Sequence, residues 1–251
     1  MSNLEILSES PLADISTLPM QDWKTISDWG KTLVIAPHPD DESLGCGGTI
    51  ALLRELQQEV KILVLSDGTL SHPNSAKFPP AKLRDLRETE MLAALEILGV
   101  SGANATFFRY CDRSIPNEES SEFGEAVERC RRYLEEIQPQ TILVPWRRDP
   151  HPDHRAAYAL LNAADENKSR IIEYPIWLWE IAQDADAPRF DEVKAWRLDI
   201  EKVSDKKQKA IRAHASQTTD LIDDDPKGFR LTPEILANFD CQWEVYLEPI
   251  R

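Results

Sequence analysis

The sequence has little cysteine, and its cysteines form no familiar motif. Cys46, Cys111, Cys130 and Cys241 are far apart and include no Cys-x-x-Cys pair. This spacing is typical of reduced thiols and argues against a disulfide framework. We therefore expect a protein of the cytoplasm.

Long hydrophobic runs are also missing. No stretch approaches the roughly 18 apolar residues that a membrane-spanning helix needs. Acidic side chains recur through the first 30 residues, which is not typical of a signal peptide. The sequence predicts no membrane span, and it shows neither an internal repeat nor a low-complexity linker.

Positive charge is in short supply. The chain has 29 Lys and Arg residues against 44 Asp and Glu residues, which gives a formal net charge of −15. Nucleic acids and anionic membranes are bound by clustered Lys and Arg. We therefore expect no nucleic-acid partner, and the excess of acids mainly favours solubility. An assembly of identical copies remains compatible with the sequence.

What the chain does have is an alternation of apolar runs and amphipathic segments. A continuous apolar run of the buried-strand type occurs at 31–36 and another buried-type strand at 141–145, and further strands are expected at 60–65, 105–110 and 170–174. Helices are expected between them at 49–58, 81–98, 122–137 and 154–167. Such alternation predicts an α/β fold, with a mostly parallel twisted sheet and helices on both faces.

The two ends of the chain are less regular. Prolines interrupt residues 1–30, although 20–30 has the pattern of one amphipathic helix. We predict an N-terminal extension that packs on a single domain of residues 31–251. The end of that domain is expected to be an irregular elaboration, with a helix at 204–214 and a solvated acidic turn at 220–225.

Two loops hold most of the candidate site residues. The segment His38-Pro39-Asp40-Asp41-Glu42 follows one apolar strand, and His151-Pro152-Asp153-His154 follows another. Ligands of open α/β sheets bind beyond the carboxyl ends of the strands, so both loops should meet at one edge. One histidine after a strand is usually structural, but two loops rich in His and Asp indicate a metal site.

Zinc suits these side chains best. Catalytic zinc takes about three nitrogen or oxygen ligands from the protein and keeps one position open for water. His38, Asp41 and His154 are the expected ligands. Fe(II) would also accept two histidines and a carboxylate.

The neighbouring side chains have the chemistry of a hydrolytic site. Asp40 is the expected base for a metal-bound water. His151 is expected to polarise a carbonyl group or stabilise an oxyanion. Asp153 is expected to hold that imidazole in one tautomer.

The two motifs resemble the signature of the LmbE-like or PIG-L zinc-dependent de-N-acetylases, over about residues 32–174. That family removes the acetyl group from N-acetylglucosamine units. The resemblance implies a Rossmann-like fold and the same metal ligands, general base and oxyanion group. It also implies a zinc-dependent hydrolase that releases acetate from a small amino-sugar substrate.

Three further residues are expected, by the same resemblance, to contact the substrate. Arg87 lies in an Arg- and Glu-rich helix where the family binds a substrate oxygen; a solvated helix face is the alternative. Asp112 lies where the family often has an Asp near the sugar hydroxyls, unless it is a turn residue. His214 begins a His-Ala-Ser-Gln element that closes over the site in the family; a surface helix end is the alternative.

The loop at 66–80 departs from the family pattern. The usual Thr-x-Gly-Glu is replaced by Ser66-Asp67-Gly68-Thr69, and His72 follows. This loop helps to shape the sugar pocket in the family, so the particular sugar stays open. His72 is either a substrate contact or, as we favour, only a loop residue.

Two other functions remain open at this point. A metal-dependent phosphoesterase would need a second metal about 4 Å from the first, for which Glu42 and Asp149 are the available ligands. A non-catalytic carbohydrate-binding homologue would use the tryptophans to stack on sugars, although buried tryptophan is more common.

Overall fold

The computed structural model describes residues 9–166 and 169–250, which fold around one eight-stranded sheet. The strand order is β1-β7-β8-β6-β5-β2-β3-β4. The strands are β1 (Met20–Gln21), β2 (Thr32–Ala36), β3 (Val60–Ser66), β4 (Ala105–Tyr110), β5 (Thr141–Pro145), β6 (Arg170–Tyr174), β7 (Val193–Asp199) and β8 (Trp243–Pro249). All pairings are parallel except those that β8 makes with β6 and β7.

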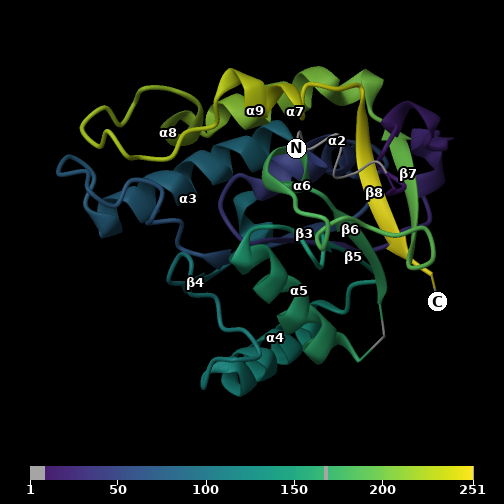
Figure 1. The fold of residues 1–251 in the computed structure, drawn as a ribbon, viewed down its shortest axis with the longest axis horizontal. Helices are drawn as coiled ribbons and strands as arrows, with labels where there is room; N and C mark the ends of the chain where they lie inside the picture. The colour runs from purple at the N-terminus through teal and green to yellow at the C-terminus, as the bar shows by residue number, and fades with distance from the viewer. Residues whose placement is uncertain (1–8, 167–168, 251) are drawn as a thin grey trace.

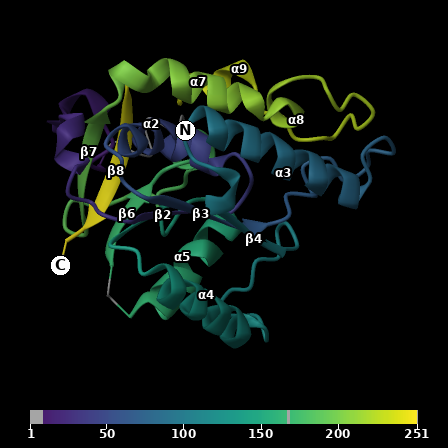
Figure 2. The same cartoon turned by 180° about the vertical axis from the view of Figure 1, so that it is seen from behind.

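Helices cover both faces of this sheet. They are α2 (Asp41–Glu55), α3 (Pro80–Ile97), α4 (Phe123–Ile137), α5 (Pro152–Asp165), α6 (Leu178–Ile181), α7 (Ser204–Ala213), α8 (Ala215–Thr218) and α9 (Pro233–Ala237). Helices α4 and α5 lie on one face, and α2, α3 and α7 lie on the other (Figures 1 and 2). The predicted α/β fold is confirmed. In the described ranges no helix is both long and apolar enough to cross a membrane.

Burial on both faces explains the continuous apolar strands. Successive side chains of a strand point to opposite faces of the sheet. In β2, Val34 packs in one core cluster with Met91 of α3, whereas Leu33 and Ile35 pack in another with Leu161 of α5. A strand covered on both faces exposes neither face to solvent, so its sequence does not alternate between polar and apolar residues.

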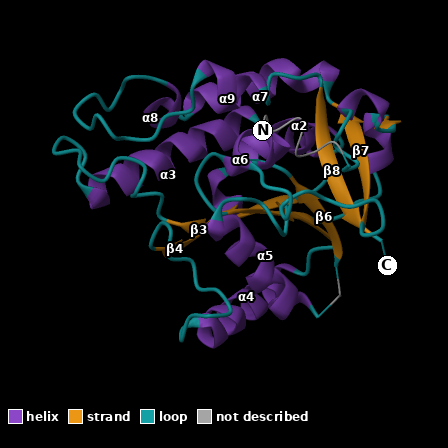
Figure 3. Cartoon of the chain, in the orientation of Figure 1, coloured by secondary structure: helices purple, strands orange, loops and turns teal. Residues whose placement is uncertain are grey.

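The topology places the two motif loops side by side. Strand β2 pairs with β3 on one side and with β5 on the other. The chain leaves β2 towards β3 and β4, and β5 and β6 continue in the opposite direction. Figure 3 shows the sheet in orange, between the helices that cover its two faces. The carboxyl ends of β2 and β5 therefore flank a topological switch point, where ligands bind in such sheets.

Two predicted helices differ from the structure. Helix α2 begins at Asp41 and not at residue 49, because the Asp40 carbonyl already accepts hydrogen bonds from the Ser43 and Leu44 amides. Residues 20–30 form no single helix; they contain strand β1 and a short 3₁₀ helix, Trp23–Ile26. The predicted end of α5 at Asn167 and residues 1–8 lie outside the described residues.

The C-terminal part is more regular than the sequence predicts. Strands β7 and β8 extend the central sheet, and β1 of the N-terminal segment pairs with β7. The helix expected at 204–214 is present as α7. The predicted solvated acidic turn is wrong in part, because Asp225 is buried and accepts a hydrogen bond from the Asn74 amide.

Candidate active site

The first turn of α2 and the second motif loop meet at one carboxylate oxygen. Asp41 Oδ2 accepts a hydrogen bond from the His38 amide (2.9 Å) and lies 3.2 Å from His38 Nδ1. Nε2 of His154, from the first turn of α5, lies 3.3 Å from the same oxygen. All three side chains are buried. The structure thus brings together the three side chains predicted to hold the metal.

His154 is held from behind by Asp149. Asp149 Oδ1 lies 3.2 Å from His154 Nδ1, and its Oδ2 accepts the amides of Ile176 and Trp177. Carboxylates commonly orient metal-binding imidazoles in this way. The sequence placed Asp149 in the motif loop, but it gave no reason to pair Asp149 with His154.

The charges around His154 fit a cation. Burial alone would lower the pKa of His154, but Asp41 and Asp149 outweigh it and raise that pKa to about 9. Neither ring nitrogen of this fully buried imidazole makes a hydrogen bond of good geometry. Nε2 lies 3.3 Å from Asp41 Oδ2 without forming a hydrogen bond. A divalent cation held by both groups would satisfy this buried nitrogen, which is costly to leave unsatisfied.

Further ligand atoms lie nearby. In the described part of the chain, the ligand atoms of His38, His151 and His154 lie within 4.8 Å of one another, as do those of His38, Asp112 and Asp153. His38 is common to both groups and to the predicted trio. The donor set of imidazoles and carboxylates therefore fits a divalent metal ion.

The Asp40 side chain lies next to this cluster but points towards Arg87. Its carboxylate accepts a hydrogen bond from Arg87 Nη2 at 3.0 Å. Burial raises the pKa of Asp40 to about 6, although the Arg87 charge opposes the rise. The backbone of Asp40 has φ 149°, a region that favours glycine. Such strain often marks a functional residue.

Arg87 is a buried part of the site and not a solvated helix face. It is 3% exposed and also donates to the carbonyls of Gly68 and Pro39. These three bonds join α3 to both the motif loop and the loop after β3. Arg87 lines the cavity described below, and its bond to Asp40 fixes the carboxylate there.

The prediction for Asp153 needs correction. Its carboxylate contacts His38 Nε2 (3.1 Å) and the Arg113 amide (2.7 Å), not the His151 imidazole. His151 is instead the N-cap of α5, and its Nδ1 accepts the Asp153 amide. Because Nδ1 accepts, the proton of the neutral ring is assigned to Nε2. Burial lowers the pKa of His151 to about 3, so the ring is neutral.

The other expected contacts divide into two groups. Asp112 lies in the site, because its Oδ1 is 3.3 Å from His38 Nε2 and its Oδ2 accepts the Leu70 amide. His214 differs from the prediction: it is 1% exposed and contacts Glu42 and Ser43 of α2, behind the cavity wall. His72 is buried against Gly228 and does not line the cavity.

These groups open into a cavity of about 290 Å³. Its polar side contains His38, Asp40 and His151. The apolar part of its lining was not identified from the sequence. It includes Trp177, whose ring stacks on His151 at 6.5 Å, and Phe229, whose ring meets Trp177 edge to face at 5.7 Å. Those aromatic side chains come from segments far apart in the chain, so no local motif marks them.

Two loops close this cavity from the side of α3 and α8. The Phe229 amide donates to the Ser71 carbonyl, and Ser75 Oγ donates to Asp224. Figure 1 shows the loop before α3 and the loop after α8 side by side. The loop at 66–80 is therefore held in place over the site by residues 223–229.

Comparison with known proteins identifies the class of fold and then the family. The structure resembles that of N,N'-diacetylchitobiose deacetylase from Pyrococcus horikoshii, with a TM-score of 0.61 and 24% identity, over 87% of this chain and 79% of that one. The GlcNAc-PI de-N-acetylase (PIG-L) family profile matches residues 33–164. This is more than half of the chain, which therefore belongs to that family.

Two relatives support this placement. A probable N-acetyl-alpha-D-glucosaminyl L-malate deacetylase 2 of Bacillus subtilis is 26% identical over 224 residues, which is 85% of this chain and 95% of the relative. A diacetylchitobiose deacetylase of Thermococcus kodakarensis is 29% identical over 217 residues, which is 81% of this chain and 76% of the relative. The predicted membership of the family is confirmed.

One relative has a different activity. A 4-oxalmesaconate hydratase of Pseudomonas putida is 28% identical over 203 residues, which is 74% of this chain and 73% of the relative. The shared fold therefore does not by itself decide the reaction.

Proposed function

We propose that this protein is a zinc-dependent hydrolase that removes the acetyl group from an N-acetylglucosamine-type amino sugar or its conjugate. One observation carries the proposal. The Asp40 carboxylate lies beside the His38, Asp41 and His154 cluster and not within it, it is held by Arg87, and it lines the cavity. A general base must lie within reach of the proton that it accepts.

His38, Asp41 and His154 would hold the metal. When bound there, the ion would polarise the amide carbonyl and lower the pKa of water.

The four cysteines are free thiols, which supports the expectation of a reducing compartment such as the cytoplasm.

The chain's own groups move the protons. Asp40 accepts a proton from the attacking water and then returns it to the nitrogen of the leaving amine. Arg87 keeps the Asp40 carboxylate in position through its 3.0 Å hydrogen bond. The Nε2–H of His151 donates to the oxyanion as the carbonyl carbon becomes tetrahedral. Asp112 lines the cavity and is our candidate for a sugar hydroxyl.

Two substitutions separate metal binding from proton transfer. Asp40→Asn keeps the shape of the side chain but removes the base, so kcat for acetate release should fall by ~10²–10⁴-fold with the metal content unchanged. His38→Ala should lose both metal and activity. Elemental analysis and an acetate assay measure the two properties. Turnover of Asp40→Asn at the wild-type rate would show that the base is assigned wrongly.

Hydration is the second candidate, because one relative is a hydratase. Hydration and amide hydrolysis both add water to the substrate, but only deacetylation releases acetate. Incubation with N-acetylglucosaminides and with unsaturated carboxylic acids, followed by product analysis, separates the two.

The phosphoesterase alternative finds little support. Both oxygens of Asp149 are already engaged, and Glu42 bonds to the Asp40 amide, Ser43 and His214. We expect one metal ion per chain.

A further inference from the structure

A second cavity adjoins the catalytic one. Its volume is about 520 Å³, and it lies between the segment after β4 and the first turns of α4 and α5. Arg113 lines both cavities. Asp153, whose carboxylate contacts His38, also lines the second cavity. A ligand that reaches from one cavity into the other therefore passes over Arg113.

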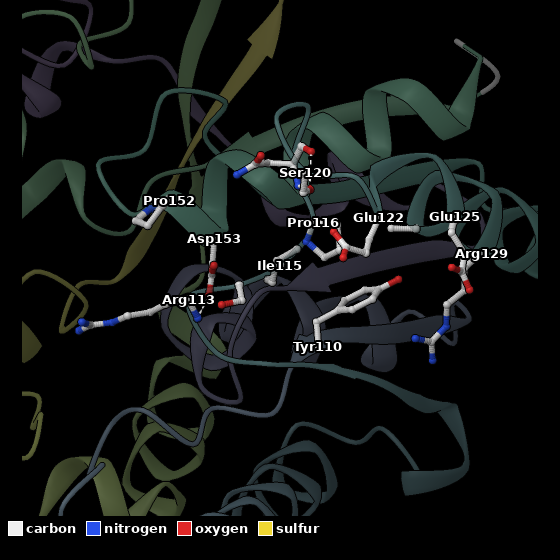
Figure 4. Close-up of a pocket in the computed structure, with 13 residues that line it drawn as sticks. Tyr110, Arg113, Ile115, Pro116, Ser120, Glu122, Glu125, Arg129, Pro152 and Asp153 are labelled. Carbon is white, nitrogen blue, oxygen red and sulfur yellow. Dashed lines mark hydrogen bonds between the residues drawn. The ribbon is translucent and has the colours of Figure 1, made fainter.

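Arg113, which separates the two cavities, is hydrogen-bonded to a residue of the catalytic site. The Arg113 amide donates to Asp153 Oδ2 at 2.7 Å, and Arg113 has φ 60°, which is uncommon for a residue other than glycine. Figure 4 shows the Arg113 side chain extending away from Tyr110, so it leaves that side of the cavity open. The hydrogen bond from the Arg113 amide to Asp153 therefore ties the segment between the two cavities to the catalytic site.

The second cavity has an aromatic side and a polar side. Figure 4 shows Tyr110 pointing along the cavity towards Glu125 and Arg129. The Arg129 guanidinium is held over the Phe108 ring, 3.9 Å from its centroid, and donates to the Phe108 carbonyl. The same guanidinium also lies 5.3 Å from the centroid of the Tyr110 ring, so this cation is already engaged by the protein and Tyr110 meets the cavity with the rest of its ring.

The acids of the same cavity are not engaged. Over residues 9–166 and 169–250, no ion pair is formed by Glu122 or Glu125, both of which are exposed. Two free carboxylates repel an anionic ligand but accept hydrogen bonds from hydroxyl groups. A tyrosine ring offers a flat apolar surface for the face of another ring.

From this geometry we propose that the second cavity is a subsite for a further, uncharged, hydroxylated ring of the substrate, namely a second sugar unit. The proposal rests on the proposed deacetylase function and refines it. The amino sugar to be deacetylated occupies the catalytic cavity. The second ring packs on Tyr110, and Glu122 and Glu125 accept its hydroxyl groups.

The test compares two substrates that differ by one ring, methyl N-acetylglucosaminide and N,N'-diacetylchitobiose. Tyr110→Ala should raise KM for the disaccharide by ~10-fold, which corresponds to the loss of one ring contact. For this variant, kcat for the disaccharide should stay unchanged, and so should kcat and KM for the monosaccharide. Tyr110→Phe, which keeps the ring, should behave like the wild type.

Glu125→Gln keeps the size of the side chain and should raise the same KM to a smaller extent. Glu136→Gln is the matched control, since Glu136 is exposed on the same helix and lines neither cavity. Equal effects of Tyr110→Ala on both substrates, or none on either, would overturn the subsite.

If the proposed deacetylase function is wrong, the experiment gives a result different from those that overturn the subsite. The wild type would then release no acetate from either sugar. Calorimetric titration with N,N'-diacetylchitobiose tests the cavity in that case. Binding that Tyr110→Ala weakens would uphold a sugar subsite, and absence of binding to the wild type would overturn it.

Discussion

At the scale of single residues, neighbours in the sequence face different groups. Asp41 faces the two imidazoles, whereas Asp40 turns towards Arg87. The residue types and their spacing were enough to predict this division. They were not enough to predict the partners of Asp153 and Asp149, because those depend on how the start of α5 is turned towards β2.

Asp149 provides a prediction at this scale. Asp149→Asn should weaken metal binding by ~10–100-fold, because a carboxylate behind a ligating histidine orients the ring and raises its basicity. Asp184→Asn is the control, since Asp184 is exposed and lines neither cavity. Competition with a chromophoric chelator measures the affinity. Equal affinity of wild type and Asp149→Asn would show that His154 needs no such support.

At the scale of elements, helix α2 shows where sequence patterns mislead. Its first half contains Gly45, Gly47 and Gly48, which are poor helix formers. Tertiary packing requires them: a Cβ at Gly45 would lie 2.3 Å from the ring of Tyr174, and one at Gly48 would lie 2.6 Å from Ile200. The sequence therefore predicted the helix to start too late, although the apolar strands on either side were predicted correctly.

The glycines of α2 and α4 should respond oppositely to alanine. Gly45→Ala should destabilise the protein by about 1–3 kcal/mol through overpacking. Gly124→Ala in α4 meets nothing within 4 Å, so it should be neutral or stabilising by about 0.5–1 kcal/mol. Midpoints of urea unfolding measure both. If the two variants had the same midpoint, the close packing of α2 on Tyr174 would be contradicted.

At the scale of the whole molecule, the C-terminal part completes the sheet and supports the site. Strands β7 and β8 lack the continuous apolar runs of the central strands, since side chains such as Lys194 face solvent. Their sequence therefore resembled an irregular segment. Glu244 of β8 accepts the Gly48 and Thr49 amides of α2 and pairs with Lys207 of α7 at 2.8 Å.

This buried pair gives a prediction for global stability. Lys207 and Glu244 are 2% and 3% exposed. Lys207→Met should cost about 3–5 kcal/mol, because it leaves a buried carboxylate without its cation. Lys209→Met, at an exposed position of the same helix, should cost little. Chemical denaturation measures both, and a small effect of Lys207→Met would show that the C-terminal part is only loosely attached.

The central claim is that one metal ion, held by His38, Asp41 and His154, supports removal of an N-acetyl group. The most direct measurement is acetate release from a panel of N-acetylglucosaminides by protein that has been dialysed against a chelator and then titrated with zinc. We predict no release from the dialysed protein and full recovery at about one zinc per chain. Release that is indifferent to the chelator, or no release from any sugar by the fully loaded protein, would contradict the account.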